Sequence, residues 1–193
     1  MPTSSNDIRT LANAKLQTRS VDTNSPSIGQ VEGYACVFSQ PSEDMGFTEY
    51  ISPHAFDGVD MSNVLALYNH DLSNILGRVT ASTLTLNIDK TGLHFVLDMP
   101  DTTLGRDTYA NVQNGNLQGC SFGFTIADDD WSQDNDGTLV HTINQIDQLI
   151  EISITPLPAY TETSVAVSRG FKNYKDIQEK QKLKLILSTY EED

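Results

Sequence analysis

Short runs of apolar and β-branched residues, separated by turn-forming residues, follow one another from Gly29 to Thr155. They cover residues 31–38, 64–68, 75–86, 93–98, 119–127, 139–146 and 149–155. Regular short strands of this kind are typical of sheets that close as a sandwich or a barrel. We therefore predict a mainly β (α+β) fold, a closed or partly closed β-barrel with a few short flanking helices.

Helical signals are sparse in this region. Ser52 and Pro53 have the residue types of an N-cap and a first helical position, which predicts a single helical turn. Apolar residues along one side predict a longer helix over residues 103–114, and Gly115 follows it as a C-terminal cap. Asp136-Gly137 predicts a hairpin turn.

The two ends of the chain differ in composition from its centre. Residues 1–28 are rich in Ser, Thr and Asn, which predicts a flexible N-terminal leader. Residues 29–168 hold the predicted strands and form the expected folded domain. Residues 169–193 form a charged tail, in which interleaved Lys and Glu predict an exposed helix over residues 174–187.

The negative charge of the chain lies in its centre. The chain has 12 basic and 26 acidic residues, a formal net charge of −14. Three of the basic and 19 of the acidic residues lie within 29–168, which gives that region a net charge of −16. Such a body repels phosphate groups, so we expect no binding of nucleic acid or of an anionic membrane by the central domain.

The cysteines point neither to a disulfide framework nor to zinc. Two cysteines, Cys36 and Cys120, are too few for a disulfide framework, and they lack the paired spacing of zinc ligands. We therefore expect both to be small buried residues in a reducing compartment. The N-terminal residues lack the apolar core of a signal peptide, and no apolar run approaches the ~20 residues that span a bilayer. We expect a soluble protein inside the cell that makes it, with no cofactor and no metal.

Ser121 is the candidate nucleophile. Its strand directs apolar residues to the core, so that Ser121 faces the opposite side between Gly119 and Gly123. Without side chains at these neighbours, a peptide backbone can approach the hydroxyl. The alternative is that the glycines merely accommodate a neighbouring aromatic ring. Cys120 points to the core and is the poorer nucleophile.

Of the four histidines, His70 is the best placed to act as a base. It follows the apolar strand 64–68, and strand ends are where a rigid scaffold delivers residues to a site. A solvated loop residue is the alternative. His54 lies in a first helical turn, where the macrodipole disfavours its protonated form. His94 and His141 are expected on the surface.

Glu151 is the candidate acid. Isoleucines alternate with polar residues over 149–155, which places Glu151 on the polar face of a core strand. An acid there can fix the tautomer of a catalytic histidine, and a lone solvated glutamate is the alternative. Asp71 is less suitable because it is adjacent to His70, and adjacent strand residues point apart.

The acidic segment 128–137 matches a calcium-binding loop only in part. In the closest register to an EF-hand loop, Gly137 takes the sixth position, but Ile143 stands where a bidentate Glu is required. We therefore predict a solvated hairpin tip.

Several blocks of sequence stand in order at compatible spacing: Glu32–Phe38, Glu49–Phe56, Tyr68–Asp71, Leu76–Arg78, Thr91–Leu93, Gly115–Phe124 and Glu151–Tyr160. Together they resemble the tailed-phage (caudovirus) prohead or capsid-maturation serine proteases, which are related in fold to the herpesvirus assemblin protease. The resemblance covers residues 29–168. His54 and Tyr160 depart from it, since the family usually has Gly and Asn at these positions.

The resemblance implies roles for the three candidates. His70 is then the general base, Ser121 the nucleophile and Glu151 the residue that orients and stabilises the imidazolium. The implied activity is that of a serine endopeptidase that works through an acyl-enzyme, with backbone N–H groups around the oxyanion. Arg78 is a further candidate to assist, with an ordinary salt bridge as its alternative.

The resemblance also implies substrates and partners. These are a scaffold protein or the scaffolding segment of the major capsid protein, cut inside the assembling prohead in the host cytoplasm, together with self-cleavage and a homo-oligomeric state. The basic residues of 169–190 suggest docking on an acidic assembly partner and removal on maturation. One alternative is a catalytically inactive capsid-assembly chaperone or scaffold-binding module on the same fold. A more distant alternative is a carbohydrate- or protein-binding β-sandwich.

Overall fold

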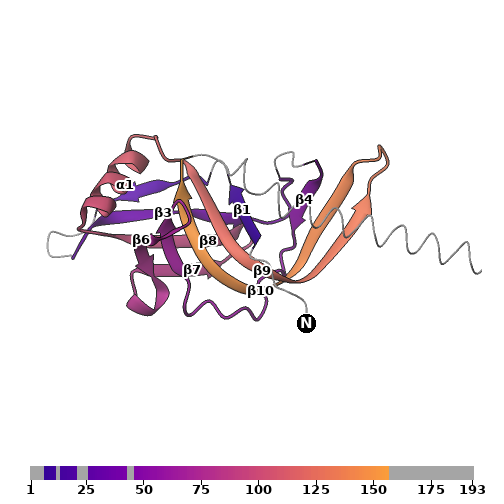
Figure 1. The fold of residues 1–193 in the computed structure, drawn as a ribbon, viewed down its shortest axis with the longest axis horizontal. Helices are drawn as coiled ribbons and strands as arrows, with labels where there is room; N and C mark the ends of the chain where they lie inside the picture. The colour runs from indigo at the N-terminus through magenta and orange to yellow at the C-terminus, as the bar shows by residue number, and fades with distance from the viewer. Residues whose placement is uncertain (1–6, 12–13, 21–25, 43–45, 157–193) are drawn as a thin grey trace, which may run out of the picture.

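A computed structural model of the chain describes residues 7–11, 14–20, 26–42 and 46–156, which form two β-sheets and two short helical elements (Figure 1). In chain order the elements are β1 (Asp7–Leu11), β2 (Gln17–Arg19), β3 (Ser27–Val37), β4 (Thr48–Ile51), β5 (Leu65–Tyr68), β6 (Asp71–Arg78), the 3₁₀ helix η1 (Val79–Ala81), β7 (Leu84–Ile88), β8 (Gly92–Pro100), α1 (Thr103–Gln113), β9 (Gly119–Gln133) and β10 (Leu139–Thr155). The helix predicted over 174–187 lies outside the described residues. Neither helical element in the described ranges is long and apolar enough to cross a membrane.

The first sheet is built around the long hairpin of β9 and β10. Its strand order is β1-β9-β10-β5-β6, and β4 pairs with the beginning of β10. β10 runs antiparallel to β9 and parallel to β4 and β5. Gly137, with φ of 92°, lies in the predicted turn, and the hairpin extends beyond the rest of the sheet as a ribbon (Figure 1).

The second sheet has the order β2-β3-β8-β7, and all its ladders are antiparallel. α1 follows β8 and confirms the helix predicted over residues 103–114. The Thr102 side chain caps its first turn by accepting a hydrogen bond of 3.0 Å from the Gly105 N–H. Gly115 follows the helix with φ of 73°, the left-handed conformation typical of a residue beyond a helix end.

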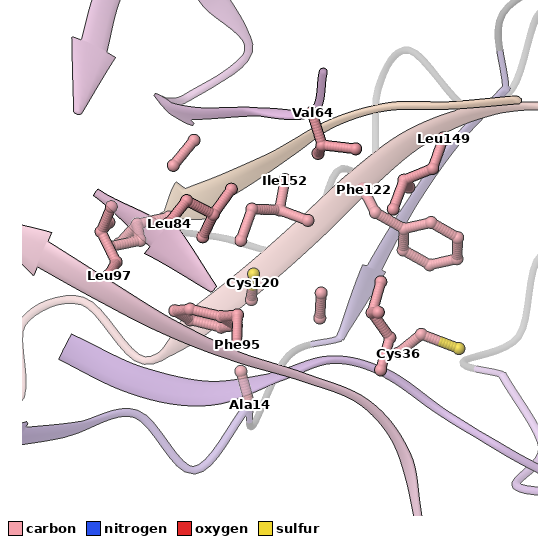
Figure 2. Packing of buried hydrophobic residues seen from close by; sticks show 14 of the residues in the cluster. Ala14, Cys36, Val64, Leu84, Phe95, Leu97, Cys120, Phe122, Leu149 and Ile152 are labelled. Atoms are coloured by element: carbon pink, nitrogen blue, oxygen red, sulfur yellow. The ribbon is translucent and has the colours of Figure 1, made fainter. Parts of the chain in front are cut away.

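The hydrophobic core lies between the two sheets (Figure 2). Phe95 and Leu97 of β8 are buried in one cluster with Phe122 of β9 and Ile152 of β10. The mainly β class is confirmed, but the predicted barrel is wrong, because no ladder in the described ranges joins the end strands of one sheet to those of the other. The alternating apolar positions satisfy burial equally well when two open sheets stack face to face.

The structure divides two predicted stretches of strand differently. The strand predicted over residues 75–86 is divided into β6, η1 and β7, and Ser82 turns the chain there with φ of 57°. The strands predicted over 139–146 and 149–155 are one strand, β10, with register shifts between Ile143 and Glu151. Alternation breaks at these bulges, so a single bulged strand has the pattern of two strands.

Turns also differ from the predicted elements. The residues after Ser52 form successive hydrogen-bonded turns rather than a turn of helix. The acidic segment 128–137 is strand as far as Gln133, so the tip is confined to its last residues. Aspartates are poor strand formers, and here the pairing with β10 overrides that preference.

Two strands lie within residues 1–28, the predicted flexible leader. β1 pairs with β9, and β2 pairs with β3. Both strands are short and carry many polar side chains, so their sequence has no apolar periodicity that would reveal them.

The two-layer core predicts a contrast between two leucines. Leu97 is fully buried, whereas Leu72 of β6 is 68% exposed. Leu97→Ala is expected to lower the free energy of unfolding by about 2–5 kcal/mol through lost burial and a residual cavity. Leu72→Ala is expected to change it by less than about 0.5 kcal/mol. Urea titrations measure both values, and equal effects would contradict the proposed position of the core.

Candidate active site

Ser121 lies on β9, between β1 on one side and β10 on the other. Its cross-strand neighbours are Thr10 of β1 and Ser153 of β10. Residues directly opposite each other in antiparallel strands point to the same face, with Cβ atoms about 4.5–5.5 Å apart. Ser121 is therefore covered and has 0% exposure, whereas the sequence pattern predicted an open face around it.

Gly123 lies two residues further along β9, opposite Glu151 of β10. A Cβ atom at Gly123 would lie 2.8 Å from Glu151 Oε1. The missing side chain thus provides the space in which the buried Glu151 carboxylate lies. In the structure, Gly123 leaves room for the Glu151 carboxylate. The sequence analysis predicted instead that this glycine leaves room for a peptide to approach the Ser121 hydroxyl.

His70 lies in the tight turn between β5 and β6. Asn69 and His70 both take the left-handed conformation, with φ of 52° and 60°. The turn is fastened to β10, because the His70 N–H donates to Ser153 Oγ at 3.0 Å and the Asn69 N–H donates to the Ile154 carbonyl at 3.1 Å. This unusual backbone conformation holds the imidazole over β10 rather than in solvent.

The Glu151 carboxylate joins the turn to the strand. Its Oε1 lies 2.7 Å from His70 Nδ1, and its Oε2 accepts a hydrogen bond of 2.6 Å from Ser153 Oγ. The other ring nitrogen of His70, Nε2, is buried and has no hydrogen-bond partner among the described residues. The structure thus brings His70 and Glu151 together through Nδ1 of the ring.

The Ser121 hydroxyl is bonded to β1 rather than to His70. Ser121 Oγ donates to the Arg9 carbonyl at 2.8 Å and accepts from the Thr10 hydroxyl at 3.1 Å. All three proposed residues therefore belong to one region of the first sheet, but within the described chain no hydrogen bond completes the link from His70 to Ser121.

A buried ionic cluster fixes β1 to the sheet. The Arg9 guanidinium donates to both carboxylate oxygens of Glu49, with Nη2 at 2.7 Å from Oε2. His141 Nδ1 lies 2.8 Å from Glu49 Oε2, and its Nε2 lies 2.8 Å from Asp129 Oδ2. The cluster therefore connects β1, β4, β9 and β10 through charged groups.

The expectation of a surface His141 is wrong, since its exposure is only 3%. Trp131 stacks on its ring, with the centroids 4.2 Å apart. The sequence did carry a signal for this position, because His141 and Ile143 share a face of β10 and Ile143 belongs to the core. On β4, Glu49 likewise shares a face with the core residue Ile51.

The remaining candidates take no part in the hydrogen bonds that the His70 and Ser121 side chains make. His54 is exposed on a turn, and Asp71 is exposed at the start of β6. Arg78 lies at the other end of β6 and has no salt bridge in the described ranges. Cys36 and Cys120 are buried, as predicted, and burial raises the pKa of both thiols.

Two further candidates give no site. His94 is half-buried on β8 in the second sheet, and Tyr160 lies outside the described residues. The part of the chain that the structure describes contains no group of three or more His, Cys, Asp or Glu arranged to hold a metal ion.

Comparisons with known proteins agree with this architecture. The solved structure of the bacteriophage T4 capsid assembly protease, gp21, matches with a TM-score of 0.51 over 78% of this chain and 96% of that one. The two chains are 8% identical, so this similarity concerns the fold alone.

A model of the caudovirus prohead serine protease family matches residues 14–177. The chain therefore belongs to that family, which confirms the resemblance found in its sequence. The prohead protease of Enterobacteria phage HK97 is 27% identical over 158 residues. The match covers 78% of this chain and 66% of the HK97 protein, so the chain spans just under two thirds of that relative's length.

The ionic cluster shifts the pKa values of its members. For Glu49, burial opposes ionisation, but Arg9 and His141 outweigh it and hold the pKa of the carboxyl below its usual range. For His141, burial disfavours the imidazolium, but the carboxylates of Asp129 and Glu49 outweigh it and raise the pKa. The imidazolium is thus more stable in the folded than in the unfolded chain.

This shift predicts a pH-dependent contribution of His141 to stability. Below the ordinary value of 6.5, His141→Gln is expected to cost about 2–4 kcal/mol of unfolding free energy, because a buried charged partner is lost. The cost is expected to fall as pH rises through the raised pKa, since the folded imidazolium then loses its proton. Urea titrations across pH measure it, with the exposed His54→Gln as control, and a pH-independent cost would contradict the assignment.

Proposed function

We propose that the chain is a serine endopeptidase with Ser121 as nucleophile, His70 as general base and Glu151 as the orienting acid. The observation that carries the proposal is the short contact between buried Glu151 and His70 Nδ1, which leaves a buried Nε2 without a partner among the described residues. A carboxylate on one ring nitrogen fixes the proton there, so that the other nitrogen accepts one.

In the proposed reaction, His70 Nε2 takes the hydroxyl proton as Ser121 Oγ attacks a peptide carbonyl. The tetrahedral intermediate collapses to an ester on Ser121, and the amine leaves with the proton that His70 returns. Water then hydrolyses the ester by the same route. The Glu151 carboxylate stabilises the imidazolium through His70 Nδ1, while Ser153 Oγ donates a hydrogen bond to its second oxygen.

The proposed substrates follow from the family and from the descriptions of its relatives as prohead and capsid assembly proteases. They are a scaffold protein, or the scaffolding segment of the major capsid protein, cut in the assembling prohead within the host cytoplasm. Self-cleavage and a homo-oligomeric state belong to the same proposal. A net charge of −16 over 29–168 supports a body that does not bind nucleic acid or an anionic membrane.

The second candidate is a non-catalytic assembly module on the same fold. It is favoured by one observation, the bond of the Ser121 hydroxyl to the Arg9 carbonyl in place of His70. Co-expression with the capsid and scaffold proteins distinguishes the two candidates.

Ser121→Ala is expected to abolish processing of the co-expressed capsid or scaffold protein, because no nucleophile remains. Ser132→Ala is the matched control, since Ser132 is exposed on the same strand near the hairpin tip. Gel electrophoresis and intact mass of the capsid protein measure the outcome. Equal trimming with both variants would contradict the protease assignment and leave the assembly module.

Glu151→Gln tests the acid separately. The amide cannot stabilise the imidazolium and allows the wrong tautomer, so cleavage is expected to slow by up to about 10⁴-fold, as for the equivalent change in other triads. Glu32→Gln is the matched control, because Glu32 is also buried but lies in the second sheet beside Arg19. Initial rates on a purified scaffold substrate, with urea titrations as a check of folding, decide it. Equal rates for both variants would remove Glu151 from the mechanism.

A further inference from the structure

β1 occupies the edge of the first sheet beside the proposed nucleophile. It is the end strand of that sheet, and it pairs antiparallel with β9 from Asp7 opposite Phe124 to Leu11 opposite Cys120. Extended peptides bind proteins in this way, by adding a strand to an open sheet edge. The part of β9 that carries Ser121 is therefore an edge on which a peptide can add, and the chain's own leader fills it.

The contacts of β1 oppose catalysis at Ser121. The hydroxyl proton that the base must take is donated to the Arg9 carbonyl at 2.8 Å, and Ser121 Oγ itself accepts a hydrogen bond of 3.1 Å from the Thr10 hydroxyl. His70 Nε2 meanwhile has no partner within the described ranges. A strand that both covers the nucleophile and takes its hydrogen bond keeps nucleophile and base apart.

Arg9 anchors this strand by its side chain as well as by its backbone. The guanidinium is buried, bonds to both oxygens of Glu49 and lies 3.6 Å from the Asp7 carboxylate. It also lies over the ring of Phe124, 5.7 Å from the centroid. Removing one partner of a buried ion pair that is joined by two hydrogen bonds leaves the other charge buried without a partner, which is strongly unfavourable.

We propose that β1 is an inhibitory strand, held by the Arg9–Glu49 ion pair, that blocks Ser121 until an extended substrate peptide replaces it on the edge of β9. The inference rests on the proposed function, because it assumes Ser121 to be the nucleophile. β1 ends its sheet, so its release breaks the ladder with β9 and leaves the pairing of β9 with β10 intact.

The experiment measures how fast a fluorophosphonate probe labels Ser121 in the full-length chain. Arg9→Met keeps the apolar stem and removes the charge, so labelling is expected to be at least tenfold faster than in the wild-type chain. Arg19→Met is the matched control, because Arg19 pairs with Glu32 from β2 and is 63% exposed. Ser121→Ala gives the background, and peptide mapping locates the label.

A peptide supplied in trans completes the test. A synthetic peptide of residues 5–13 is expected to slow labelling of the Arg9→Met variant, and the same peptide with Met in place of Arg9 is expected to slow it less. Hydrogen exchange checks the folding of each variant. In Arg9→Met, the β1 amides are expected to exchange faster while those of β9 and β10 keep their protection. If Arg9→Met does not fold, Thr10→Val replaces it and is expected to accelerate labelling about twofold or more.

Each outcome separates the inference from the function on which it rests. Labelling of Ser121 at the same rate in wild-type and folded Arg9 or Thr10 variants would overturn the inhibitory strand and leave the protease. Cleavage of the wild-type chain between Arg9 and Thr10, absent in Ser121→Ala, would mean that β1 binds productively and would also overturn it. No labelling of Ser121 in any folded variant would overturn the proposed function and the inference with it.

Discussion

The hydrogen bonds of one buried carboxylate, that of Glu151, hold the candidate site together. A buried charge costs several kcal/mol unless its oxygens are bonded, and here His70 and Ser153 bond to them. This requirement explains the left-handed turn at His70, whose backbone is fastened to the same serine. It also explains Gly123, because any side chain there would displace the carboxylate. The pairing of β9 with β10 sets Glu151 opposite Gly123 and Ser153 opposite Ser121.

A second buried carboxylate, Glu49, ties the leader to this sheet. The central region of the chain, residues 29–168, has only three Lys and Arg residues, and Glu49 takes its guanidinium partner, Arg9, from outside that region. The excess of acidic residues in the central region thus provides a partner for a basic residue of the leader. The leader supplies charge to the folded body, and in doing so lies across the proposed nucleophile.

The sequence predicted the parts of the fold that depend on apolar burial and the residues that depend on local position. Strand alternation predicted Ser121 and Glu151 on the faces of their own strands that point away from the predicted core, and the strand end singled out His70. It could not predict β1, since that strand is held by backbone bonds and a charge rather than by an apolar stripe. The sequence could not show whether the sheets close into a barrel, because burial of every second residue occurs in stacked sheets and in barrels alike. The shared face with Ile143 gave a signal for the burial of His141, but its charged partners Glu49 and Asp129 come from other strands and could not be predicted.

The most direct test of the account is the identity of the residue that carries the acyl group during turnover. Cleavage of a scaffold substrate is quenched in acid, which preserves an ester intermediate, and the digested protein is mapped by mass spectrometry. The account predicts an acyl group on Ser121 that accumulates during the reaction and disappears when substrate is exhausted. An acyl group on the adjacent thiol of Cys120, or cleavage with no adduct on Ser121, would contradict it.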